Sequence, residues 1–256
     1  MEYSVIGKKK RKLILIIVAI CIVIMISFMI ADWIAFFQGY QSIYSAIMKP
    51  TVSVLTGIIV FSIGENALDE KDKKLLTLSY FFIIPTDISM SIVRFAPNPT
   101  IELIVFLIGG VLSILAHIVL IWRHGKGFEY LKSKERSVIS KILPLLVIYA
   151  IVTVIFIPLI PGFIRVGHLE IAAFYAGFLG ISTWIAYETI RNKLYPPINA
   201  WLIFIAITCW LLTEIVGAIY NIQIGVISDV IFNIIWIFYG TNVILLSLSG
   251  YRWTEE

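Results

Sequence analysis

Residues 8–37 read KKKRKLILIIVAICIVIMISFMIADWIAFF, a basic cluster followed by a long apolar run. A helix that crosses a bilayer needs about 17 to 25 predominantly apolar residues, and the run from 13 to 37 meets this requirement. The basic cluster resembles the start of a signal peptide, but the apolar run is too long and no small-residue cleavage site follows it. The stretch therefore predicts a retained transmembrane helix.

The rest of the chain repeats this pattern. Of its 256 residues, 60% are hydrophobic and only 14% are charged, whereas a water-soluble domain has about a quarter of its residues charged. We therefore predict an all-α polytopic membrane helix bundle, formed by a single domain over residues 1–256. The apolar windows predict eight transmembrane helices, at about 13–37, 46–64, 74–95, 100–123, 141–161, 169–190, 199–222 and 224–249.

The distribution of Lys and Arg predicts the orientation. The basic lead at 1–12, the segments 69–74, 123–141 and 191–193, and Arg252 fall on one side if there are eight spans. Cytoplasmic loops carry an excess of Lys and Arg, so both termini are expected in the cytoplasm, and the membrane is expected to be the plasma membrane. Basic residues distributed in this way are topology signals, and we expect no nucleic-acid partner. The cytoplasmic loop 124–140 is long enough for a short surface helix.

Several ionisable side chains fall inside the apolar runs. Such residues are costly in a membrane, so each requires a partner, a water-filled cavity or a proton. A helix rises 1.5 Å per residue, which places Asp87 and Glu214 at nearly the same depth, roughly 20 Å from the cytoplasmic ends of their spans. The intramembrane polar residues are Asp32, Lys49, Asp87, His117, Glu188, Glu214, Asp229, Tyr239 and Asn242.

Asp87 and Glu214 allow two interpretations. Two carboxyl groups in a low-dielectric pocket do not both ionise easily, so one can stay protonated as a general acid while the other is an anion. Alternatively, the acids pair with Lys49 or accept backbone hydrogen bonds near Pro85. Lys49 and Asp229 both lie near the outer face, so they could join the two acids in one cluster.

The remaining intramembrane ionisable groups favour structural roles. Asp32 and Glu188 lie close to span ends, where a side chain reaches water easily. A lone histidine in an apolar helix, such as His117, is typically a packing residue, although it could orient a neighbour.

Other chemistries lack the residues that they need. Cys21 and Cys209 show no CxxC spacing, and three histidines in separate segments do not form a zinc site. The last span contains no lysine for a retinal Schiff base, and no GxSxG or Walker sequence is present. We therefore expect no metal and no cofactor.

The order of the polar landmarks resembles that of one membrane-protein family. These landmarks are Lys49-Pro50, Thr86-Asp87, Ala116-His117, Thr213-Glu214 and the FYGTN sequence at 238–242. Together they resemble the YhhN-like lysoplasmalogenase family over most of the chain. The chain departs from the family where it has Thr86 instead of Gly, Thr213-Glu214 instead of Ser-Asp, and Asn242 instead of Gln.

The resemblance implies a membrane lipid hydrolase that cleaves the vinyl-ether bond of a lysoplasmalogen, a substrate that enters from the bilayer. It implies that Asp87 and Glu214 are the catalytic acid and carboxylate, in an order left open. Lys49 and Asp229 would hold the phosphate end or tune the pair, Tyr239 and Asn242 would line the cavity, and His117 could orient a neighbour.

Two other classes of function remain open at this point. One is a lipid-binding or small-molecule-binding membrane protein or sensor without turnover. The other is a proton-coupled transporter, which requires ionisable groups across the full membrane thickness. The acidic residues here are concentrated in the outer half, which weakens the transporter interpretation. A homodimer is also possible.

Overall fold

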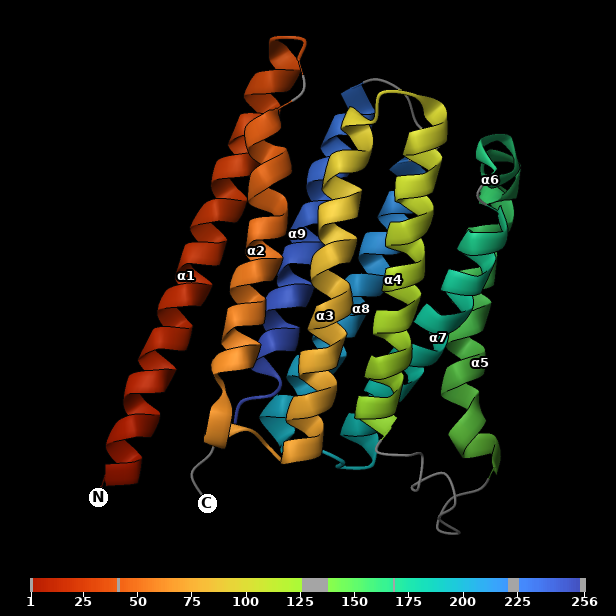
Figure 1. The fold of residues 1–256 in the computed structure, drawn as a ribbon. Helices are drawn as coiled ribbons and strands as arrows, with labels where there is room; N and C mark the ends of the chain where they lie inside the picture. Colours follow the sequence, from red (N-terminus) through yellow and green to blue (C-terminus); the bar gives the residue numbers. More distant parts are fainter. Residues whose placement is uncertain (1, 41, 126–137, 168, 221–225, 254–256) are drawn as a thin grey trace.

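The computed structural model describes the backbone of residues 2–40, 42–125, 138–167, 169–220 and 226–253, and within these ranges it consists of long helices joined by short connections (Figure 1). The predicted all-α class is confirmed. The helices are α1 (Glu2–Phe37), α2 (Ile43–Ser62), α3 (Glu70–Ile92), α4 (Pro99–Gly125), α5 (Val138–Phe156), α6 (Ile160–Val166), α7 (Leu169–Arg191), α8 (Pro197–Tyr220) and α9 (Val226–Leu248).

Seven stretches of the described residues are long and apolar enough to cross a membrane. Six of them are α1 to α4, α7 and α8, and the seventh, Ile139–Arg165, joins α5 and α6 through a 3₁₀ turn. The predicted eighth span corresponds to α9, in which the described apolar part is Asn233–Leu248. The chain is therefore an integral membrane protein with a polytopic helix bundle.

Some predicted boundaries are corrected by the helices. The second span begins before the predicted residue 46, because α2 starts at Ile43, is capped by the hydroxyl of Ser42 and contains Pro50 in its interior. Residues 2–12 of the predicted basic lead are part of α1, which begins at Glu2. Both ends of the predicted loop 124–140 are helical, because α4 extends to Gly125 and α5 begins at Val138. The rest of that segment, 126–137, lies outside the described ranges.

Figure 1 shows a central part of the bundle, with α1 on one side of it and α5 and α6 on the other. Helices α2, α3, α4, α7, α8 and α9 pack in the centre, while α1 packs mainly on α2, and α5 packs on α7. The beginning of α1 and the end of α9 lie at the same end of the bundle, as expected for an even number of crossings (Figure 1). We call this the terminal end.

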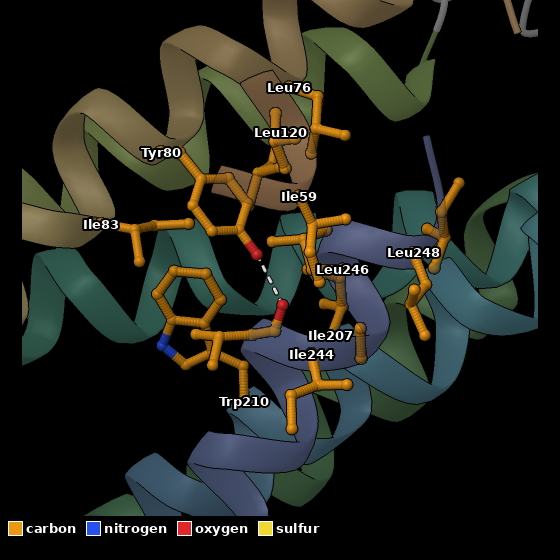
Figure 2. Packing of buried hydrophobic residues seen from close by; sticks show 14 of the residues in the cluster. Ile59, Leu76, Tyr80, Ile83, Leu120, Ile207, Trp210, Ile244, Leu246 and Leu248 are labelled. Atoms are coloured by element: carbon orange, nitrogen blue, oxygen red, sulfur yellow. Dashed lines mark hydrogen bonds between the residues drawn. The ribbon is translucent and has the colours of Figure 1, made fainter. Parts of the chain in front are cut away.

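The central helices enclose an apolar core. In this core the aromatic rings of Tyr80 and Trp210 lie among aliphatic side chains from five helices (Figure 2). The hydroxyl of Tyr80 donates to the carbonyl oxygen of Val243 at 2.5 Å, so α3 is tied to α9 by a hydrogen bond as well as by packing. Gly57 allows the approach of α2 to α3, since a Cβ atom there would lie 2.9 Å from the side chain of Ile84.

A buried ionic cluster joins the helices at the terminal end. Arg123 on α4 donates from Nε and Nη2 to both oxygens of Asp72 on α3, at 3.0 and 2.9 Å. Both side chains are almost completely buried. Arg123 also donates to the hydroxyl of Ser249, and Asn199 donates to the backbone carbonyls of Ser249 and Tyr251. We call these five residues and Tyr195 the Arg123 cluster.

Tyr195, in the connection between α7 and α8, completes this cluster. Its hydroxyl lies 2.9 Å from the Asp72 carboxylate and 2.7 Å from the carbonyl oxygen of Arg123. Burial and the charge of Asp72 raise the pKa of Tyr195 well above its usual value, so the phenol stays neutral and can donate. The cluster therefore connects α3, α4, α8 and the segment after α9.

Candidate functional site

Asp87 lies on α3, two residues after Pro85, which is accommodated inside the helix. The Asp87 side chain is buried, with 3% of its residue surface exposed. It accepts a hydrogen bond from the hydroxyl of Ser53 on α2 and another, at 2.5 Å, from the hydroxyl of Tyr239 on α9. Three helices therefore position this carboxyl group, and two hydroxyl donors face it.

Glu214 lies on α8, and the structure places it at the level predicted for it. It follows the start of α8 by the same number of residues as Asp87 follows the start of α3. Both helices start at the terminal end (Figure 1). Its Oε1 accepts a hydrogen bond from the hydroxyl of Tyr175 on α7 at 2.9 Å. Glu214 is less buried than Asp87.

The two acids lie at one level of the bundle and have separate hydrogen-bond partners. Packed side chains connect them, since Asp87 accepts from Tyr239, whose ring contacts the ring of Trp210, one turn before Glu214 on α8. The described donors to Asp87 are Ser53 and Tyr239, and the described donor to Glu214 is Tyr175. The structure thus brings the predicted pair into one region and places each acid in a different environment.

Aromatic rings fill the space between the two sets of partners. The ring of Trp210 lies edge-on to Tyr239, with centroids 6.2 Å apart, and 4.1 Å from the imidazole of His117. The imidazole in turn lies 5.4 Å from the ring of Tyr175. The indole N–H of Trp210 lies toward Glu214 without reaching hydrogen-bond geometry. His117 therefore belongs to the surroundings of Glu214, as a residue that contacts its partner.

Lys49 is paired with a different acid. Its ammonium group lies 2.8 Å from Oδ2 of Asp32 on α1, and Lys49 is only 2% exposed. The rings of Phe28 and Trp236 lie 5.5 and 5.3 Å from the same nitrogen, within the range of a cation–π contact. The predicted pairing of a buried acid with Lys49 is thus found for Asp32, which was expected to reach water instead.

The other sequence candidates are distributed as follows. Asn242 is fully buried on α9, one turn after Tyr239, and neither atom of its amide has a hydrogen-bond partner among the described residues. Glu188 has a structural role, since it binds Arg191 and Asn192 near the end of α7. The side chain of Asp229 lies outside the described residues.

Three residues that contact the acids or their partners were not predicted from the sequence: Ser53, Tyr175 and Trp210. Serine, tyrosine and tryptophan are common in membrane helices, so their presence there is no signal. The contact of Tyr175 with His117 depends on the packing of α7 against α4, which the sequence does not show.

Comparisons of the chain with protein-family models, with curated proteins and with solved structures found no match. The fold and the site therefore define the class: a polytopic α-helical membrane protein that holds two acidic side chains, with phenol and serine donors, inside its bundle.

Proposed function

We propose that this protein is a membrane lipid hydrolase resembling the lysoplasmalogenases, and that it cleaves the vinyl-ether bond of a lysoplasmalogen. The observation that supports this function is the placement of Asp87 and Glu214 at one level of the bundle, each with its own hydrogen-bond donors. An acid and a carboxylate are sufficient for this reaction, as they are for the related oxocarbenium chemistry of glycosidases.

The hydrogen bonds favour one assignment of the two roles. Asp87 accepts from two hydroxyl groups, and hydrogen bonds donated to a carboxylate favour its charged form. Glu214 accepts a single hydrogen bond from Tyr175 and is the more exposed of the two. We therefore assign Glu214 as the proton donor that reaches the substrate and Asp87 as the anion.

The reaction then takes place in three steps. Glu214 gives its proton to the vinyl carbon farther from the ether oxygen, which leaves an oxocarbenium ion that the Asp87 carboxylate stabilises. Water adds to the other vinyl carbon and loses a proton to the Glu214 carboxylate, which restores the acid and gives a hemiacetal. The hemiacetal collapses to a fatty aldehyde and the free hydroxyl of the glycerophospho-head group, and both acids return to their starting states.

The substrate is an amphiphile with one chain, and we propose that it enters from the bilayer, most simply from the plasma membrane. The described ammonium of Lys49 already has Asp32 as a partner, so a phosphate could bind there only in competition with that carboxylate. We therefore assign no phosphate contact to Lys49, and we assign the catalytic roles to Asp87 and Glu214 alone.

Purified protein incubated with a lysoplasmalogen is expected to release fatty aldehyde. The matched control substrate is the lysolipid with a saturated alkyl ether at the same position, which cannot form the oxocarbenium ion by protonation and is expected to stay intact. If the folded protein binds both lipids and cleaves neither, the hydrolase proposal is wrong and the binder or sensor interpretation replaces it.

Tyr239→Phe removes one of the two hydrogen bonds to Asp87. A hydrogen bond to a charged group contributes about 1.5–3 kcal/mol, so we expect kcat for aldehyde release to fall about 10- to 100-fold. Tyr149→Phe is the matched control, because the Tyr149 hydroxyl donates to the backbone carbonyl of Gly177 instead of an acid. Equal losses in the two variants would contradict the role of Tyr239.

A further inference from the structure

The hydroxyl of Tyr175 has three polar neighbours. It lies 2.9 Å from Oε1 of Glu214, 3.1 Å from the hydroxyl of Ser113 and 3.4 Å from Nε2 of His117. Ser113 and His117 are one turn apart on α4, so α4, α7 and α8 all converge on this phenol. No step of the proposed hydrolysis uses Ser113, His117 or Tyr175.

His117 is fully buried, and its second ring nitrogen is unsatisfied. Nδ1 has no hydrogen-bond partner among the described residues. A buried polar atom without a partner is uncommon and usually indicates a functional role or a bound water molecule. A neutral imidazole has one N–H donor and one bare acceptor nitrogen, so the state of Nδ1 determines what Nε2 can do toward Tyr175.

The hydrogen-bond inventory allows two arrangements around the phenol. When Glu214 is ionised, Tyr175 must donate to it, and the Nε2–H of His117 can donate to the phenol oxygen. When Glu214 is protonated, its O–H can donate to the phenol oxygen, and Tyr175 is then free to donate to a bare Nε2. In the second arrangement His117 carries its proton on Nδ1. The tautomer of His117 is thus linked to the charge of Glu214.

We infer that His117 and Tyr175 form a proton relay to Glu214. A proton from water is taken up at Nδ1 of His117, the Nε2 proton passes to the oxygen of Tyr175, and the original phenol proton passes to Oε1 of Glu214. The net result is a protonated Glu214, a neutral Tyr175 and a neutral His117 in its other tautomer. This inference rests on the proposed function only in so far as Glu214 needs a proton for catalysis.

The charged and titratable groups near the relay are few. Asp87 lies on α3 at the level of Glu214 on α8. Two turns along α4 from His117, His124 is fully buried, with its Nε2 3.2 Å from Nη1 of Arg123. His117 itself is fully buried, and burial disfavours the charged form of an imidazole. Neutral tautomers of His117 therefore suit the site better than an imidazolium.

The test is ¹⁵N NMR of the full-length protein labelled in histidine, over a series of pH values. His117 is assigned by the signals that disappear in His117→Gln. In the unmodified protein we expect a neutral His117 that changes from the Nε2–H tautomer at high pH to the Nδ1–H tautomer at low pH. In Glu214→Gln we expect a single tautomer at every pH, and in Asp87→Asn we expect the change to persist.

Tyr175→Phe is expected to abolish the change, while Tyr187→Phe, a substitution on the same helix at a more exposed tyrosine, is expected to preserve it. The relay is refuted if His117 keeps one tautomer throughout in the unmodified protein, becomes an imidazolium, or changes tautomer in Glu214→Gln as it does in the unmodified protein. If Tyr175→Phe does not fold, the tautomer of His117 in Glu214→Gln decides whether the relay exists. These signals need no substrate, so the relay can be tested even if no aldehyde is released.

Discussion

Asp87→Asn and Glu214→Gln are each expected to lower kcat for aldehyde release by about 10²- to 10⁴-fold, the usual contribution of a positioned general acid or base. Glu214→Gln removes the proton that the vinyl carbon receives. Asp87→Asn removes the negative charge that stabilises the oxocarbenium ion, while the amide still fits among Ser53 and Tyr239. KM is expected to change little, because neither group is assigned to binding the head group. Initial rates with a lysoplasmalogen at several concentrations separate the two constants.

Glu170→Gln provides the control for these two variants. Glu170 lies in the first turn of α7, five residues before Tyr175, and is exposed, so this substitution removes a carboxylate that faces water and should leave kcat unchanged. The acid-pair mechanism would be contradicted by a folded Asp87→Asn or Glu214→Gln variant whose kcat remains within about threefold of the unmodified protein.

The second large effect concerns the Arg123 cluster. Asp72→Ala is expected to lower the free energy of unfolding by about 3–5 kcal/mol, because it leaves the buried guanidinium of Arg123 without a counter-charge. Tyr195 loses one of its two acceptors in the same substitution and keeps the carbonyl oxygen of Arg123. Equilibrium unfolding of the purified protein in mixed micelles, with increasing denaturing detergent, measures this loss.

An exposed ion pair on the same helix provides the comparison. Glu70 and Lys74 lie 3.6 Å apart, and their side chains are 69% and 73% exposed. Glu70→Ala should therefore cost less than about 1 kcal/mol. If Asp72→Ala destabilises the protein no more than Glu70→Ala does, the Arg123 cluster does not hold the terminal end together.

Much of the fold could be predicted from the sequence because its signals are local. Each apolar run has the length of a bilayer crossing, and the regular rise of a helix places Asp87 and Glu214 at one level. The same local signals gave no indication that Asp72 and Arg123, in the segments 69–74 and 123–141, pair with each other. Both lie at the ends of apolar runs, where charges usually face water, and only the packing of α3 against α4 buries them as a pair.

The candidate site was predicted only in part, for a similar reason. An acid in an apolar run is conspicuous because its insertion is costly. Its hydroxyl partners are inconspicuous, because Ser53 and Tyr175 are compatible with apolar helices whether or not they face an acid. The acid that pairs with Lys49 could not be predicted, because it depends on which helix packs beside α2. That helix is α1, which carries Asp32, and the acids on α3 and α8 do not pair with Lys49 in this way.

The most direct test of the acid-pair mechanism is to run the reaction in D₂O with the unmodified protein and with Glu214→Gln. The mass of the released aldehyde is then measured by mass spectrometry. Protonation of the vinyl carbon by an exchangeable acid predicts an aldehyde with one deuterium on the carbon next to the carbonyl group, and almost no aldehyde from Glu214→Gln. Aldehyde without deuterium, equal release by the two proteins, or no release by the folded unmodified protein would contradict the proposal that Glu214 and Asp87 cleave a vinyl ether.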